Sequence, residues 1–182
     1  MDTMHPTLSK YTVGVMGSGT FEHDEYARPV GEALADLGAN LLTGGGGGVM
    51  TAVSRAFTRA PRRRGMSIGI IPCVSESDRG TPKAGYPNEF VELAIYTHLP
   101  YSGQQGTHDL SRNHINVLSC AAIVALPGED GTAAEVSLAI RYRKPVIVYS
   151  PIAELVQHFP QAARRVGSVA DLRHCLAPYV VP

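Results

Sequence analysis

Three glycine-containing turns carry the groups of this chain that could hold an anionic ligand. They are Gly17-Ser18-Gly19-Thr20, the five-glycine run at 44–48, and the turn Pro127-Gly128-Glu129-Asp130-Gly131-Thr132. Glycine lets a backbone approach a ligand closely, and the free N–H groups at the start of a following helix bind phosphate. The sequence therefore predicts a phosphate site built from loops of this kind.

The first turn has two interpretations. Gly17, Ser18 and Gly19 could contact a ligand, with Ser18 contributing its hydroxyl. The same residues could instead form a tight turn in which Thr20 caps the next helix, because threonine is a favoured N-cap residue. Both interpretations stay open from the sequence.

The second turn is harder to explain without a ligand. Ordering glycine weakens a structure by roughly 0.5–1 kcal/mol per residue relative to alanine, so five in a row need a reason. No Gly-Lys-Ser/Thr follows, which excludes a Walker loop. We expect backbone N–H groups to approach an anion here, and the predicted phosphate-binding residues are Gly45, Gly46, Gly47, Gly48, Val49 and Met50.

The third turn poses a choice between chemistry and structure for Glu135. Thr132-Ala-Ala-Glu135 has the T-x-x-E spacing of a capping box, in which both side chains satisfy N–H groups at a helix start. Glu135 could equally be a catalytic carboxylate, with the turn binding the ligand. The residues predicted for that binding are Pro127, Gly128, Gly131 and Thr132.

Glu129 is the anomalous residue of this turn. A carboxylate 4 Å from a phosphate is unfavourable by about 1 kcal/mol in water and about 4 kcal/mol near a protein surface. A helix N-terminus offers an anion only about 0.3–1 kcal/mol. We therefore predict that Glu129 faces solvent or pairs with a cation, while its backbone contacts the ligand.

The elements that would position these turns alternate along the chain. Strand-like runs occupy residues 11–17, 39–45, 66–72, 91–96, 121–127 and 145–150, and helical patterns occupy 21–38, 48–60, 110–119 and 132–143, with one or two more around Leu155 and Leu172. Pro29 predicts a kink or a late start in the first helix. This alternation predicts an α/β fold: one doubly wound, Rossmann-like domain over residues 1–182, with a central, mainly parallel sheet flanked by helices. Residues 1–10 are expected to be flexible, and ligands are expected beyond the carboxyl ends of the strands.

Composition excludes several classes of partner. The 182 residues include 16 basic and 16 acidic side chains, so no net charge favours nucleic acid or membranes. No signal peptide or apolar run long enough to span a bilayer is evident. The cysteines at 73, 120 and 175 show no metal-ligand spacing, and we predict no metal site. Reduced thiols favour a cytoplasmic protein.

Five strings, taken in order, resemble the Lonely Guy superfamily of Rossmann proteins, formerly labelled lysine decarboxylases. They are VGVMGSG, LLTGGGGGVM, SIGIIP, SRNHINVLS and ALPGEDGTAAEVSLAI, and the resemblance extends from about residue 12 to residue 149. Members of one branch hydrolyse the N-glycosidic bond of nucleoside 5′-monophosphates. Members of the other carry the molybdenum cofactor, a pterin with a phosphate. INVLS, GTAAEVSLAI and KPV are closer to the carrier branch.

The resemblance implies roles for two residues. Arg112 stands where the hydrolases have an arginine, and Glu135 stands where they have the glutamate of PGGxGTxxE. As catalytic residues, Glu135 could stabilise the charge that develops on the ribose or activate water, and Arg112 could hold the phosphate or orient Glu135. The carrier branch has an arginine and a GTxxE at the same places, and the second glycine of PGG is Glu129 in this chain.

Our first interpretation is thus an enzyme, a phosphoribohydrolase that releases free base and ribose 5-phosphate and requires no cofactor. The alternative is a non-catalytic carrier that binds molybdenum cofactor as its ligand. The expected partner is a nucleoside monophosphate resembling AMP or a pterin phosphate, and the resemblance implies a homodimer or homotetramer. Tyr96 or Tyr101 could stack on the base or pterin, although a place in the core is equally plausible for either tyrosine.

Overall fold

The computed structural model describes residues 11–61 and 63–180, and the expected flexibility of residues 1–10 lies outside these ranges. The strands are β1 (Thr12–Met16), β2 (Asn40–Thr43), β3 (Ser67–Ile71), β4 (Leu93–Tyr96), β5 (Ala122–Ala125), β6 (Val146–Tyr149) and β7 (Arg164–Val166). The α-helices are α1 (Asp24–Asp36), α2 (Val49–Arg59), α3 (Asn113–Leu118), α4 (Asp130–Arg141) and α5 (Val169–Val180). Two short 3-10 helices, η1 (Gly103–Gln105) and η2 (Ala153–Val156), complete the list.

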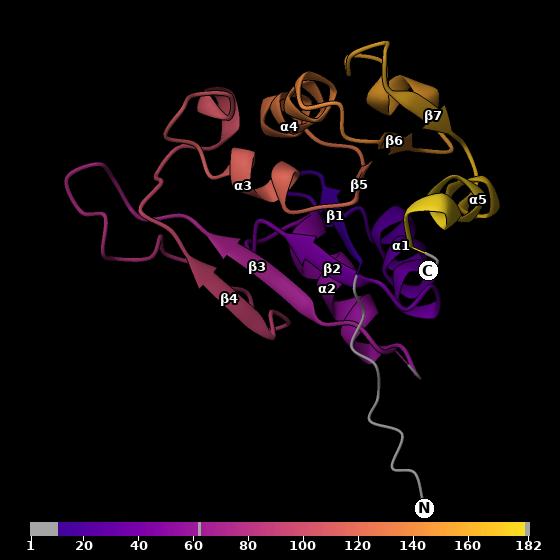
Figure 1. The fold of residues 1–182 in the computed structure, drawn as a ribbon, viewed down its shortest axis with the longest axis horizontal. Helices are drawn as coiled ribbons and strands as arrows, with labels where there is room; N and C mark the ends of the chain where they lie inside the picture. Colours follow the sequence, from indigo (N-terminus) through magenta and orange to yellow (C-terminus); the bar gives the residue numbers. More distant parts are fainter. Residues whose placement is uncertain (1–10, 62, 181–182) are drawn as a thin grey trace, which may run out of the picture.

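The strands form one seven-stranded sheet in the order β4-β3-β2-β1-β5-β6-β7, and every pairing is parallel (Figure 1). The chain builds outward from β1 to β4 and then returns to the other side of β1 with β5. The loops that leave β1 and β5 therefore diverge, which opens a crevice at the carboxyl ends of these two strands. The doubly wound α/β fold is confirmed.

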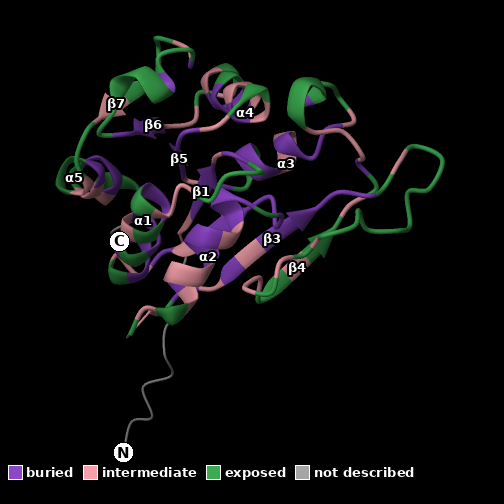
Figure 2. Cartoon of the chain, turned by 180° about the vertical axis from the view of Figure 1, so that it is seen from behind, coloured by how far each residue is buried: buried purple, intermediate pink, exposed green. Residues whose placement is uncertain are grey.

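Two apolar layers cover the sheet. On one face α1, α2 and α5 pack on the strands around Phe57, Leu34 and Leu172, and on the other α3 and α4 pack around Ile123, Leu138 and Val117. Both faces of the central strands are consequently buried, which explains their continuous apolar runs. Figure 2 shows buried central strands and an exposed edge strand, β4.

The element boundaries differ from the predicted ones mainly at helix starts. Helix α1 begins at Asp24, after His23 as its N-cap residue, so Thr20 does not cap it, and Pro29 lies inside the helix. Helix α4 begins at Asp130, two residues before Thr132. The short strand β7 was not predicted, because it is only three residues long and carries two arginines.

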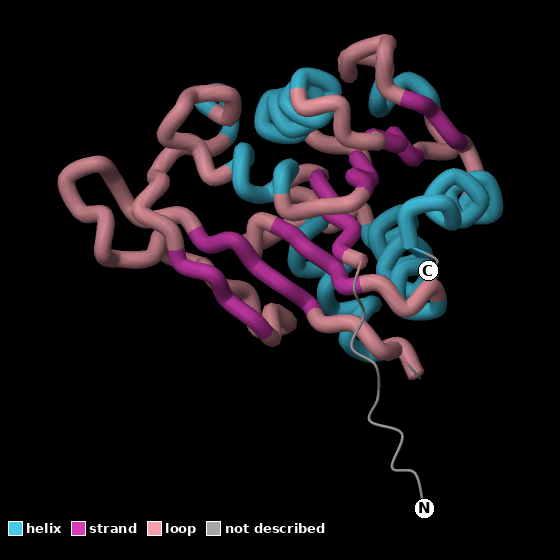
Figure 3. The backbone as a smooth tube through the Cα atoms, in the orientation of Figure 1, coloured by secondary structure: helices cyan, strands magenta, loops and turns pink. Residues whose placement is uncertain are grey.

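Two long irregular segments project beyond the carboxyl ends of β3 and β4, at residues 72–92 and 97–112 (Figure 3). They bring Tyr86, Ser102 and Gln104 toward the switch point between β1 and β5. Within residues 11–61 and 63–180, no helix is both long and apolar enough to cross a membrane.

Candidate functional site

A cavity of about 350 Å³ lies at the switch point, above the carboxyl ends of β1 and β5. The turns after these strands are joined there, because the Ser18 N–H donates to the carbonyl of Pro127 at 3.1 Å. The cavity is within the size range of small-molecule sites. The residues around it are Val15, Met16, Gly17, Gly19, Thr20, Gly44, Met50, Tyr86, Ser102, Gly103, Gln104, Arg112, Asn113, Glu129, Asp130, Gly131, Thr132 and Glu135.

Arg112 is the dominant charge in this cavity. It precedes α3 and is only 4% exposed, yet its Nε and Nη1 atoms have no hydrogen-bond partner. Its guanidinium lies over the ring of Tyr86, 5.8 Å from the ring centroid. An arginine side chain keeps its positive charge in proteins, and burying it with donor groups that have no acceptor is unfavourable. The side chain is therefore prepared for an anion.

Glu135 shares the cavity and lies on the second turn of α4. Its carboxylate is 8% exposed and accepts a hydrogen bond from Nδ2 of Asn116 at 3.1 Å. Burial raises the pKa of Glu135 to about 7, although the nearby Arg112 charge and the Asn116 hydrogen bond act in the opposite direction. The carboxyl therefore keeps its proton to a higher pH than an ordinary glutamate does.

The capping box is excluded by this geometry. Helix α4 has Glu129 as its N-cap residue, and the N–H groups of Thr132 and Ala133 both donate to the Glu129 carbonyl. Thr132 is therefore already inside the first turn, and the Glu135 side chain bonds to α3 instead of the helix start. The T-x-x-E spacing was misleading because the chain enters the helix two residues early.

Neighbouring side chains and backbone explain part of the composition of the five-glycine turn, beside the contact with an anion that the sequence predicts. A Cβ at Gly44 would lie 2.5 Å from both terminal nitrogens of Arg112, and a Cβ at Gly46 would lie 2.6 Å from the Tyr86 ring. Gly48 has a φ of +60°, and a Cβ there would lie 2.3 Å from the Ser18 carbonyl oxygen. These glycines leave room for the arginine, the tyrosine and the first turn.

The backbone N–H groups of this turn are partly engaged inside the protein. The N–H of Gly45 donates to Thr43 Oγ1 at 3.1 Å, and that of Gly46 points to the Met50 sulfur at 3.4 Å. The N–H of Val49, at the start of α2, donates to the Ser18 carbonyl at 2.9 Å. Only Gly44 and Met50 of this segment reach the cavity.

The predicted site residues thus divide into two groups. Those that line the cavity are Gly17, Gly19, Met50, Gly131, Thr132, Arg112 and Glu135. Those that do not line it are Ser18, Gly45, Gly46, Gly47, Gly48, Val49, Pro127 and Gly128. Gly128 packs against one of the lining residues, since a Cβ on it would lie 2.3 Å from Thr132 Oγ1.

Glu129 faces solvent, as expected, but it is held by a serine and by no cation of the described chain. Its Oε1 atom accepts a hydrogen bond from Ser18 Oγ at 2.9 Å. The neighbouring Asp130 accepts from Gln104 Nε2 at 3.1 Å, so η1 is tied to the start of α4. Both carboxylates border the cavity.

Several cavity residues could not be found from local sequence signals. Tyr86, Ser102 and Gln104 come from the irregular segments, and only tertiary folding brings them in. Asn113 and Asn116 were accessible to prediction, since they lie one and four residues after Arg112 on the same short helix. The expected stacking residues are elsewhere: Tyr96 is exposed on β4, and Tyr101 bonds to Glu76.

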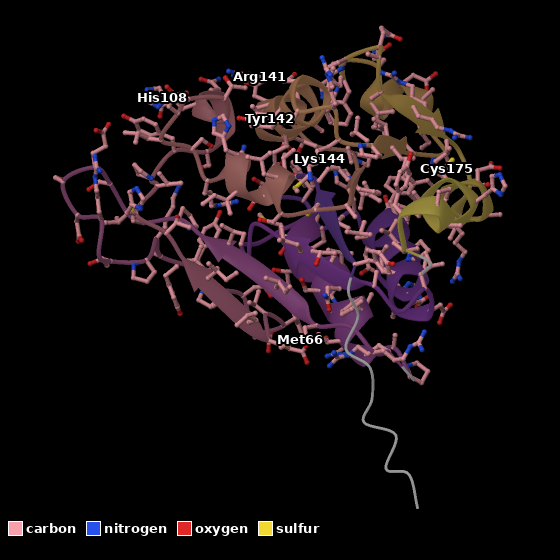
Figure 4. The ribbon with its side chains drawn as sticks, in the orientation of Figure 1. Met66, His108, Arg141, Tyr142, Lys144 and Cys175 are labelled. Carbon is pink, nitrogen blue, oxygen red and sulfur yellow. The ribbon has the colours of Figure 1, made fainter. Side chains whose placement is uncertain are left out.

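The histidines flanking Arg112 are turned away from the site. His114 bonds through its ring nitrogens to the Tyr142 hydroxyl at 2.6 Å and to the His108 carbonyl at 3.1 Å. Figure 4 labels His108, on the loop before α3, and Tyr142, at the end of α4, and neither residue lines the cavity. No group of three or more metal-binding side chains occurs in the described ranges.

Gly44→Ala should disturb the site with little effect on the fold. The added methyl would collide with the guanidinium of Arg112, which must then move away from its position in the cavity. We expect the affinity for a nucleoside monophosphate to fall about tenfold, the equivalent of one charge-assisted hydrogen bond. Titration calorimetry tests this, with Gly80→Ala as the matched control because nothing lies within 4 Å of its Cβ position. Equal affinities for the two variants would contradict the assignment.

Glu135→Gln should stabilise the protein at alkaline pH. The pKa of Glu135 is raised from 4.5 to about 7 in the folded state, so folding favours the protonated form. Its contribution to stability is complete below about pH 4.5 and is lost as the pH rises through 7, for a total of about 3 kcal/mol. Urea unfolding measures the free energy of unfolding of both proteins at pH 5 and pH 8. Relative to the wild type, the variant should be more stable at pH 8 than at pH 5, by a difference of that order. A difference in the free energy of unfolding between the two proteins that does not change with pH would contradict the burial of this carboxylate.

Comparisons with known proteins identify a family and agree with the fold. The model of the SLOG cluster4 family matches residues 10–176. An uncharacterised protein of Archaeoglobus fulgidus is 30% identical over 141 residues, covering 76% of this chain and 80% of that protein. The structure of the molybdenum cofactor binding protein from Rippkaea orientalis is similar with a TM-score of 0.68 and 28% identity, over 94% of this chain and 98% of that one. The structure of the molybdenum cofactor carrier protein of Chlamydomonas reinhardtii is similar with a TM-score of 0.69 and 28% identity, over 95% of this chain and 99% of that one.

Proposed function

The chain belongs to the SLOG cluster4 family, and on that premise we propose that it binds a phosphorylated heterocycle such as molybdenum cofactor and carries it without cleaving it. The family match agrees with the Lonely Guy resemblance, and the similar solved structures include molybdenum cofactor carriers. The proposal reverses the order of our two interpretations: the carrier is now first and the phosphoribohydrolase second.

The observation that carries the proposal is the unpaired guanidinium of Arg112. Two of its nitrogens are buried without partners in a cavity large enough for a small ligand. A phosphate would supply the missing acceptors and the missing negative charge, and arginine can bind it through two parallel hydrogen bonds. The cavity therefore fits a ligand with an anionic group.

The turn before α4 argues against the phosphate position that the hydrolase motif implies. Glu129 and Asp130 place two carboxylates at this turn, and both border the cavity. A phosphate 4 Å from one of them would lose about 4 kcal/mol at a protein surface. This repulsion supports a ligand whose phosphate lies toward Arg112, away from the start of α4.

The hydrolase remains a second candidate because of one specific observation. Glu135 lies in the same cavity as Arg112, and its pKa of about 7 suits a general acid or base at neutral pH. Such a carboxyl could assist cleavage of an N-glycosidic bond. Asn116 would then orient it.

A single incubation separates the two functions. The purified protein is mixed with a phosphorylated pterin or with AMP, GMP and a cytokinin ribotide, and bound and free compounds are analysed by chromatography. A carrier returns every ligand unchanged and retains the pterin on gel filtration. Release of free base and ribose 5-phosphate by the wild type would instead establish the hydrolase. If no phosphorylated heterocycle binds, the proposal fails.

We also propose a cytoplasmic homo-oligomer, either a dimer or a tetramer. The edge strand β4 supports self-association, because Leu93, Ile95 and Tyr96 are exposed on it. Exposed apolar edge strands are seldom left open in soluble proteins.

A further inference from the structure

The cavity has a second charged region besides Arg112, and its geometry is fixed from within the protein. Ser18 is fully buried, and its hydroxyl oxygen accepts hydrogen bonds from the N–H groups of Thr20 at 3.2 Å and Phe21 at 3.0 Å. The same hydroxyl donates to Glu129 Oε1 at 2.9 Å. Ser18 therefore orients the Glu129 carboxylate at the edge of the cavity.

The other oxygen of this carboxylate is left for a ligand. Among the described residues, Ser18 is the donor to Glu129, and it uses one lone pair of Oε1. A carboxylate has about four acceptor sites, so Oε2 and part of Oε1 remain open to donors in the cavity. The site thus combines an unpaired, buried cation with an oriented acceptor.

This combination specifies the ligand's chemistry at both ends. The end near Arg112 must be anionic, and the end near Glu129 must present hydrogen-bond donors and no exposed acceptor. A ring N–H beside an exocyclic NH₂ meets that requirement, because two parallel donors match the two oxygens of one carboxylate. The adenine edge does not, since its ring nitrogen would direct a lone pair at the carboxylate.

We propose that Glu129 determines specificity by accepting the N–H and NH₂ donors of a 2-amino-4-oxopyrimidine ring, the edge that pterins and guanine share. This inference rests on the proposed function, because it names the ligand class of the same cavity. The phosphate lies toward Arg112, and the Tyr86 ring, which the Arg112 guanidinium overlies at 5.8 Å from the ring centroid, also borders the cavity. Glu129, which departs from the PGG pattern, is then a recognition residue.

The test compares three nucleotides that differ only in this edge. GMP offers both donors, IMP offers the ring N–H alone, and AMP places an acceptor there, while all three share the ribose and phosphate. Titration calorimetry at pH 7.5 should give a wild-type affinity for GMP at least about tenfold above that for AMP, with IMP between them. Ribose hydroxyls cannot produce this order.

Glu129→Gln provides the decisive variant. Its amide oxygen can still accept from Ser18, but an NH₂ group replaces the open oxygen. We expect the preference of GMP over AMP to fall to about twofold, while AMP affinity stays the same or rises. Glu154→Gln is the matched control, since Glu154 is an exposed carboxylate outside the cavity, and it should keep the wild-type preference.

Two results would overturn the inference and leave the proposed function standing. One is equal wild-type affinity for GMP and AMP, and the other is a GMP preference that survives in Glu129→Gln. Absence of GMP binding would also overturn it, but the proposed function falls with it only if phosphorylated pterins fail to bind as well.

Discussion

Replacement of Arg112 by glutamine should reduce the affinity for phosphorylated ligands by about 30-fold or more. Removing a buried, hydrogen-bonded charge partner weakens binding by about 2–5 kcal/mol. Arg112 lies in the cavity with Nε and Nη1 unpaired, so a bound phosphate would depend on it for both charge and hydrogen bonds. Titration calorimetry with GMP or a phosphorylated pterin measures the loss.

The same variant should leave the ligand-free protein as stable as the wild type or make it more stable. Arg112 is 4% exposed and two of its nitrogens have no hydrogen-bond partner, so removing its charge relieves a desolvation penalty that the nearby Glu135 offsets only in part. Thermal unfolding without ligand tests this, and Arg141→Gln is the control because Arg141 is exposed on α4, as Figure 4 shows. A large loss of stability with unchanged binding would mean that Arg112 has only a structural role.

Arg112→Lys makes a finer distinction. Lysine keeps the charge but cannot form two parallel hydrogen bonds with one phosphate. Partial recovery of affinity in this variant would indicate that charge dominates. An affinity as low as that of Arg112→Gln would indicate that the two parallel hydrogen bonds of the planar guanidinium are required.

Ligand affinity should fall as the pH rises above 7, and Glu135→Gln should remove this dependence. Arg112 holds down the pKa of Glu135, which burial has raised to about 7. A phosphate bound to Arg112 offsets that positive charge, so the pKa of Glu135 must rise further in the complex. Binding then takes up a proton, and affinity falls by up to about tenfold per pH unit until the bound-state pKa is passed.

The measurement belongs between pH 7 and pH 9, because the phosphate of the ligand has its own pKa near 6. Cys120 lies near Glu135 but does not titrate in this window, since burial raises its pKa to about 12. The wild type should lose affinity across the window while Glu135→Gln stays flat and tighter at pH 9. A wild-type affinity that rises with pH would show that ionised Glu135 does not oppose the anion. If the wild type hydrolyses nucleotides, this variant should abolish turnover and identify Glu135 as the catalytic carboxyl.

The hydrophobic pattern of the chain was sufficient to predict its fold class. Continuous apolar runs such as those of β1 and β5 can be buried on both faces only in a parallel sheet covered by helices, and the structure has that arrangement. The alternation did not fix the order of the strands, so the switch point between β1 and β5 was placed only by the structure. The first residues of the helices were harder to predict from the sequence, since Thr132 has the spacing of a helix cap but lies inside α4.

The chemistry of the site needed the tertiary structure. Arg112 and Glu135 could be named from motifs. The surrounding side chains decide that both are buried, that two nitrogens of Arg112 lack hydrogen-bond partners and that the pKa of Glu135 is raised. The five glycines looked like an anion cradle, whereas folding places Arg112 against Gly44 and Tyr86 against Gly46.

The sequence by itself determined the parallel sheet and the identity of two charged groups, because apolar periodicity and short motifs are local properties. The tertiary structure alone decided which groups share a cavity, since Tyr86, Arg112 and Glu129 come from segments far apart in the chain. Electrostatics depends on distance and on solvent exclusion, and neither is encoded in a short stretch of sequence. For the same reason the sequence could not show that Ser18 holds the Glu129 carboxylate at the edge of the cavity.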